Sequence, residues 1–331
     1  MCVLLWGLVI SSQGAMAGDG DDWRPELHGT VRAKYEYQPP IDAGRFEVRN
    51  ARFSLSGQVS PIVSYKAEID LSDEGSIKML DAYSRIRPIE HLNFTIGQMR
   101  VPFTIDAHRS PHQQYFANRS FIAKQTGNVR DVGAVVAYHL TGSLPIVFEA
   151  GLFNGSGLTN QKDFWTSNNN YALKAQLTLP AGFGLVLSSQ RIRPVNIPVF
   201  LYDAGLFWEG HGWHIEAEYL HKYYSGNAFS RVNAFDGFIC YDLPLRRVFR
   251  KVSFLGRFDC MSNHSDGVPV DGRLVLTDSE RKRITGGITL SLQRPFISDI
   301  RINYEKYFYP ENALIHVSEQ DKFVIEFMTR F

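Results

Sequence analysis

The sequence has no long apolar run beyond its N-terminus, and it contains few cysteines. No later stretch approaches the ~20 apolar residues that a membrane-spanning helix requires, so any membrane integration must use strands. The cysteines are Cys2, Cys240 and Cys260, too few for a disulfide scaffold or a multi-cysteine zinc site. Helical heptads and glycine-rich phosphate loops are also missing. The formal net charge is only +1, which argues against a nucleic-acid partner and a polybasic membrane-surface protein.

The last residues, 321–331, alternate strictly between two faces. Phe323, Ile325, Phe327 and Phe331 share one face, whereas Lys322, Glu326 and Arg330 share the other. The closing strand of a transmembrane barrel turns its apolar face to lipid and its other face to the lumen. The alternative is an amphipathic strand packed on the core of a soluble domain.

The same alternation recurs along the chain and predicts an all-β protein, a 16-stranded antiparallel transmembrane β-barrel over residues 26–331. An even strand number leaves both termini on the periplasmic side. Aromatic residues make up 13% of the chain and fall mostly toward the strand ends, as expected for girdles in contact with outer-membrane lipid. We expect strands near residues 27–37, 51–59, 63–71, 79–87, 91–99, 130–141, 145–153, 171–179, 183–192, 199–209, 212–223, 232–242, 250–261, 283–293, 299–309 and 321–331.

The links between these strands alternate between short and long, as periplasmic turns and extracellular loops do. Residues 193–198 form the exception, since this long link is barely longer than the turns. The longer links are expected at 38–45, 72–78, 100–129, 154–170, 193–198, 224–231, 262–282 and 310–320.

The first 17 residues are typical of an export signal. Val3 to Ile10 form a short apolar region, and Ala15-Met16-Ala17 supplies the small residues of a cleavage site. No Lys or Arg precedes Arg24, so the charged start of a signal is missing, and a buried N-terminal strand is the alternative. We expect a signal peptide at 1–17, a polar lead at 18–25 and a location in the bacterial outer membrane.

The third long link, residues 100–129, is longer than strand closure requires, and we expect it to fold into the lumen as an inward-folded third extracellular loop. Its basic residues far outnumber its one acid, Asp106, so a constriction built from it would attract anions. The alternative is an external loop whose bases meet lipopolysaccharide phosphates. The candidate selectivity residues are Arg100, Arg109, Arg119 and Lys124 in this link, with Arg52, Arg85 and Arg257 on the pore wall. Acids and bases interleave on the other lumen-facing positions, so selectivity is expected from the link more than from the wall.

Several segments resemble the phosphate-selective porin O and P family. They are Arg49-Asn50-Ala51-Arg52-Phe53, Ala67-Glu68-Ile69-Asp70, Leu80-Asp81-Ala82-Tyr83, Gly97-Gln98-Met99-Arg100-Val101-Pro102-Phe103, Asn118-Arg119-Ser120, Leu152-Phe153-Asn154-Gly155-Ser156-Gly157 and Gly256-Arg257-Phe258-Asp259. The resemblance implies a trimeric sixteen-stranded barrel, an inward-folded third loop and passive diffusion of anions such as phosphate. Arg100 and Arg119 lie within or beside the matching motifs.

Three other functions were weighed. A metal site could be assembled from His211, His214, Glu216 and Glu218, but alternation places most of these along an ordinary strand. A lipid hydrolase would need a serine and a histidine facing lipid near a rim. A non-conducting barrel could serve as a structural or assembly subunit of a larger outer-membrane complex. We expect a porin for small anionic or polar solutes, with no catalysis and no cofactor.

Overall fold

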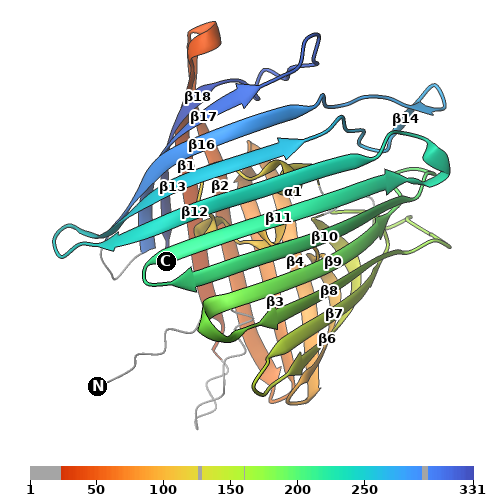
Figure 1. Ribbon diagram of the computed structural model, residues 1–331. Helices are drawn as coiled ribbons and strands as arrows, with labels where there is room; N and C mark the ends of the chain where they lie inside the picture. The colour runs from red at the N-terminus through yellow and green to blue at the C-terminus, as the bar shows by residue number, and fades with distance from the viewer. Residues whose placement is uncertain (1–23, 126–128, 160, 293–296) are drawn as a thin grey trace.

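The computed structural model is a closed barrel of sixteen antiparallel strands (Figure 1). It describes residues 24–125, 129–159, 161–292 and 297–331, so the expected signal peptide lies outside the described residues. Each strand of the barrel pairs with its neighbours in the chain, and β1 pairs with β18 to close the ring. The predicted fold class, an all-β sixteen-stranded barrel, is therefore confirmed.

The barrel strands extend close to the predicted ranges. They are β1 (Glu26–Gln38), β2 (Ala43–Ser60), β3 (Val63–Asp73), β4 (Ser76–Ile89), β5 (Leu92–Arg100), β6 (Arg130–Leu140), β7 (Ile146–Phe153), β8 (Asn170–Thr178), β9 (Phe183–Ile192), β10 (Val199–Gly210), β11 (Trp213–Tyr224), β12 (Val232–Pro244), β13 (Phe249–Met261), β16 (Arg281–Leu292), β17 (Ile297–Phe308) and β18 (Lys322–Arg330).

Short elements occupy the links. The strands β14 (Pro269–Val270) and β15 (Arg273–Leu274) form a small hairpin outside the barrel, and α1 (Phe121–Gln125) is a single short helix. The 3-10 helices are η1 (Pro39–Ile41), η2 (Asp106–His108), η3 (Pro111–Gln113), η4 (Pro180–Gly182) and η5 (Ser225–Asn227). In the part of the chain that the structure describes, no helix is long and apolar enough to cross a membrane.

The closing strand β18 shows how alternation divides the two faces. Phe323, Ile325 and Phe327 are about half exposed, at 50%, 48% and 48% of their surface, whereas Glu326 is fully buried. The apolar residues face outward and the ionised residues face inward, which is the reverse of the arrangement in a soluble protein. This arrangement suits a barrel with lipid on its outside and water in its lumen. The predicted orientation of the C-terminal strand is confirmed.

Two links predicted to be long are tight turns instead. The β1–β2 ladder continues to the pair Gln38 and Ala43, and the β3–β4 ladder continues to the pair Asp73 and Ser76. The expected loops at 38–45 and 72–78 were therefore wrong. The polar residues of these two links are typical of loops, but the hydrogen-bond ladders of the strands extend through both links.

A β-bulge in β2 changes which side chains reach the lumen. Arg32 pairs with Asn50 and Ala33 pairs with Val48, so Arg49 is the extra residue in β2. A bulge leaves one residue unpaired and shifts the facing of the residues beyond it by one position. As a result Arg45 and Glu47 on one side of the bulge face inward, as do Asn50 and Arg52 on the other side.

Gly97 occupies a position in β5 that only glycine fits. Its φ is +132°, and a Cβ atom there would lie 2.2 Å from the carbonyl oxygen of Ala82. We expect Gly97→Ala to lower the free energy of unfolding by roughly 1–3 kcal/mol, because both backbone strain and a backbone clash result. Urea unfolding in detergent micelles measures the change. Gly286→Ala is the matched control, since a Cβ there meets nothing within 4 Å, and an equal loss in both variants would contradict the argument.

Candidate functional site: a basic cavity in the barrel lumen

The connection between β5 and β6, residues 101–129, is bonded to inward-facing side chains on distant strands. Glu218 on β11 accepts the backbone N–H of Ile105, and Asn303 on β17 accepts that of Ala117 at 2.9 Å. Asp259 on β13 accepts the N–H of Phe121 at 3.0 Å. Because these strands lie in different parts of the ring, the β5–β6 connection crosses the barrel lumen, and α1 lies within the ring (Figure 1).

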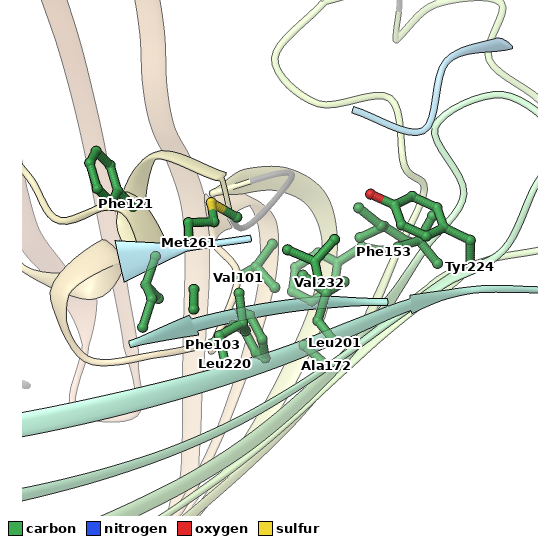
Figure 2. Close-up of a cluster of buried hydrophobic side chains, with 14 of the residues drawn as sticks. Val101, Phe103, Phe121, Phe153, Ala172, Leu201, Leu220, Tyr224, Val232 and Met261 are labelled. Atoms are coloured by element: carbon green, nitrogen blue, oxygen red, sulfur yellow. The ribbon is translucent and has the colours of Figure 1, made fainter. Parts of the chain in front are cut away.

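Apolar contacts hold the two ends of this connection against the wall. Val101, Phe103 and Phe121 belong to one buried cluster with inward-facing residues of the strands, among them Leu201 and Leu220 (Figure 2). Burial of such side chains contributes roughly 1.5–3 kcal/mol each. The connection is therefore fixed in the lumen by packing as well as by hydrogen bonds.

A cavity lies beside the connection, and we call it the basic cavity. Eight basic residues and two acids line it. Six of the bases come from β1, β2 and β18, and two come from the connection. The bases are Arg32, Lys34, Arg45, Arg49, Arg52, Arg119, Lys124 and Lys322, and the acids are Glu36 and Glu74.

At least four of the eight bases have a carboxylate partner that is more buried than the base itself. Arg32 contacts Glu326, whose side chain is fully buried, and Arg52 contacts Asp70 at 2.8 Å, also fully buried. Arg45 contacts Glu36 at 2.7 Å, yet 57% of the Arg45 side chain is exposed against 5% for Glu36. In these pairs the base is the more exposed partner, whereas Glu36 and Glu74 line the cavity together with the bases.

The predicted pore residues occupy different places. Arg52, Arg119 and Lys124 line the basic cavity. Arg109, Arg119 and Arg257 line a second, much smaller cavity on another side of the connection.

Arg109, Arg257 and Arg119 are held by close contacts. Arg109 is ion-paired with Glu216, and its guanidinium lies 5.1 Å from the ring centre of Tyr115. Arg257 donates to the carbonyl of Asn118 at 3.0 Å. Arg119 donates to the backbone carbonyls of Asp106 and Arg109 at 2.6 and 2.9 Å. These contacts fasten the connection in place, while Arg119 still borders both cavities.

The remaining two candidates border neither cavity. Arg100 donates to the carbonyls of His108 and Arg109 at 2.6 and 2.8 Å, so its guanidinium ties the first part of the connection to β5. Arg85 donates to the hydroxyl of Thr95 at 3.1 Å and lies over the ring of Tyr83. Their place in the pore stays a prediction, and the contacts of both are with the protein itself.

Sequence reasoning missed Arg45, Arg49 and Lys322 as cavity residues. Arg45 falls in a predicted loop, and Arg49 falls in a segment that resembles a family motif. The bulge in β2 has no clear sequence signature, so alternation does not predict that these residues reach the cavity. Alternation predicts that Lys322 faces the lumen, but it does not distinguish Lys322 from the other lumen-facing residues. Its position directly after the last loop was the available signal, and in the structure its ammonium lies 3.7 Å from the carboxylate of Glu36 on β1.

The two histidines of the connection add no positive charge at neutral pH. Burial lowers the pKa of His108 well below its usual value, and the nearby Lys174 and Arg100 lower it further. Burial, with the charge of Arg330, lowers the pKa of His112 to about 3. The positive charge of the connection therefore comes from its arginines and Lys124.

Lys124 gives the cavity a pH dependence. Although 33% of its side chain is accessible, the barrel surrounds it, and this burial lowers its pKa to about 8 against the opposing effect of Glu319. Lys124 is thus charged below about pH 8 and neutral above it. We expect anion preference to fall as pH rises from 7 to 9.5, measured by reversal potentials. Lys124→Arg, which keeps its charge, should remove this fall, and an unchanged fall would assign it to another group.

His214 and Glu216, two of the four residues of the candidate metal site, contact each other. His214 contacts Glu209 and Glu216, and Glu216 is also the partner of Arg109. Within the described residues, no group of three or more His, Cys, Asp and Glu side chains is placed to hold a metal ion. Cys240 and Cys260 are free thiols in the structure.

A closed sixteen-stranded barrel with an ionised lumen and an inserted connection defines the class of porin barrels. Residues 27–188 match the model of the family described as phosphate-selective porin O and P, which confirms the family resemblance of the sequence motifs. The motif at Gly256 lies outside the matched residues. A comparison with curated proteins found no match.

Solved structures share the fold at low sequence identity. The OmpF of Salmonella typhi in complex with daunomycin has a TM-score of 0.64 at 11% identity, with 93% of this chain and 97% of that chain covered. An anion-selective porin from Comamonas acidovorans has a TM-score of 0.61 at 10% identity, with 93% and 98% covered. The OprB of Pseudomonas putida has a TM-score of 0.63 at 10% identity, with 93% and 94% covered. These similarities show that the fold is that of a porin.

Proposed function

We propose that the protein is an outer-membrane porin through which small anions diffuse passively, with phosphate-like anions as the preferred class. The observation that carries the proposal is the basic cavity, where eight bases and two acids surround a space inside the barrel. Guanidinium groups bind phosphate and carboxylate oxygens in a fixed planar geometry. The solute gradient supplies the driving force, and no catalytic step is involved.

Electrostatics gives this cavity its selectivity. A narrow polar passage with positive groups raises the local concentration of anions and lowers that of cations. The acids that pair with these bases weaken the positive potential of the cavity. A bound anion is therefore held weakly enough to leave again. Weak binding is a requirement for conduction, because a tightly held ion would block the passage.

The setting follows from the fold and the family. We propose an N-terminal signal peptide at residues 1–17 for export, lipid and lipopolysaccharide around the outward apolar face, and a homotrimer as the assembly. The porin family match and the solved porin folds support the outer membrane as the location. The OmpT of Vibrio cholerae, a further solved barrel of similar fold, is described in a trimer form.

A second candidate function has one observation in its favour. Gln114, Asn118 and Arg119 line both cavities, so the connection forms a partition between them. Asn118 bonds to Lys34, Glu36 and Glu305, which holds this partition in place. A barrel sealed there would be a structural subunit without conduction.

Single-channel recording of the purified protein in planar bilayers separates the two functions. The porin proposal predicts discrete ion-permeable openings, and persistent silence of folded, inserted protein supports the structural subunit. Asn118→Ala should raise the conductance of each opening, because it shortens a side chain of the partition. Asn196→Ala, on the link between β9 and β10, is the control and should leave conductance unchanged.

A further inference from the structure

The link between β12 and β13 differs in charge from the other short links that the structure describes. It contains Arg246 and Arg247, and Arg250 follows at the start of β13. The other described short links, at residues 61–62, 90–91, 141–145, 179–182 and 211–212, contain no Lys or Arg. Three arginines are thus concentrated at one position of this rim, which lies at the same end of the barrel as the C-terminus (Figure 1).

The arginines of this link are accessible. Arg246, Arg247 and Arg250 are all exposed, and the neighbouring Lys251 is ion-paired with Asp242. Exposed apolar residues lie between and beside them: Val248 is 70% exposed, and Leu243 and Leu245 are 40% and 38% exposed. The link therefore presents alternating apolar and cationic groups to its surroundings.

Aromatic residues mark the membrane boundary close to this link. Trp213 and Tyr241 face outward with their ring centres 4.5 Å apart, and Trp208 packs near Phe183 in the adjoining strands. Trp and Tyr on the outer face of a barrel concentrate at the level of the lipid headgroups. Tyr241 on β12 lies only a few residues before Arg246 in the link, so the arginines follow directly after the aromatic belt.

We propose that the β12–β13 link binds the phosphodiester headgroups of anionic phospholipids in the periplasmic leaflet. Val248 and Leu245 pack against the headgroup region, and the guanidinium groups pair with headgroup phosphates. Each arginine near an anionic lipid surface strengthens the attraction, and an apolar neighbour adds to it. The inference rests on the proposed membrane location of the barrel and does not depend on which ions the lumen selects.

Brominated lipids test the proposal, because bromine quenches nearby tryptophan fluorescence and Trp208 and Trp213 lie at this rim. The full barrel is reconstituted in vesicles that mix brominated phosphatidylglycerol with unlabelled phosphatidylcholine, or the reverse. We expect stronger quenching by the brominated phosphatidylglycerol. Combined Arg246→Gln, Arg247→Gln and Arg250→Gln should lower this preference by roughly ten-fold or more, while Arg193→Gln, Arg231→Gln and Lys282→Gln should leave it unchanged.

Two results would overturn the proposal. One is equal quenching by the two brominated lipids in the unaltered protein, and the other is a preference that survives the triple substitution at the link. Sedimentation with isolated peptidoglycan sacculi that depends on the three arginines, without a lipid preference, would identify the cell wall as the partner instead. Reversal potentials measured on the same variants should stay unchanged, which separates a failure of this inference from a failure of the porin proposal.

Discussion

Arg45→Gln combined with Arg49→Gln should abolish the anion preference of the channel. Both guanidinium groups border the basic cavity, and their loss leaves Glu36, Glu47 and Glu74 without these partners. A unit charge about 5 Å from an ion in water contributes about 0.8 kcal/mol, so removing two charges lowers the local concentration of an anion by about fifteen-fold at low ionic strength and raises that of a cation by the same factor, and together these set the anion-to-cation ratio. Reversal potentials in about 0.01 M salt, where screening is weak, measure the ratio.

The matched control removes the same charge elsewhere. Arg231 and Lys282 are exposed residues that border neither cavity, and Arg231→Gln with Lys282→Gln should leave the reversal potential within error of the unaltered protein. Equal effects of the two pairs would show that only total charge matters. If the Arg45 and Arg49 variant keeps its anion preference, the selectivity resides in the β5–β6 connection, as the sequence alone predicts.

Arg283→Met should destabilise the barrel by about 3–5 kcal/mol. Arg283 is fully buried and contacts Asp259 at 2.6 Å and Glu305 at 3.2 Å, both also fully buried. It donates in addition to the carbonyl of Arg119 at 2.7 Å, so it fastens the connection to β16. Its removal leaves two buried carboxylates without their partner, and urea unfolding followed by tryptophan fluorescence measures the loss.

Two further variants separate the charge argument from a general effect of mutation. Arg273→Met on the exposed β14–β15 hairpin should change the unfolding free energy by less than about 0.5 kcal/mol. Adding Asp259→Asn and Glu305→Gln to Arg283→Met should recover much of the lost stability, because no unpaired buried charge remains. A triple variant as unstable as Arg283→Met alone would point to lost packing around Phe121 instead.

The alternation of apolar and polar residues along the chain predicts most of the fold. Phe323, Ile325 and Phe327 share one face because the strand period is two, and the same rule placed Glu326 in the lumen. This periodicity does not predict where a hydrogen-bond ladder ends, so it does not predict the tight turns after Gln38 and Asp73. Those boundaries depend on cross-strand hydrogen bonds, which a single strand does not reveal.

The candidate site was harder to predict because it depends on contacts between distant segments. Arg100 and Arg109 looked like pore residues by charge, but backbone carbonyls and Glu216 hold them in the structure. Arg49 reaches the cavity because of a bulge, a local irregularity that alternation does not predict. Sequence therefore located the basic connection, while the larger share of the basic cavity comes from β1, β2 and β18.

The sign of the reversal potential across a planar bilayer with a potassium chloride gradient tests the central claim most directly. A lumen dominated by the basic cavity predicts the sign that chloride permeation produces, at neutral pH and most strongly in dilute salt. The opposite sign, set by potassium, would show that the acids of the wall outweigh these bases and would contradict the account.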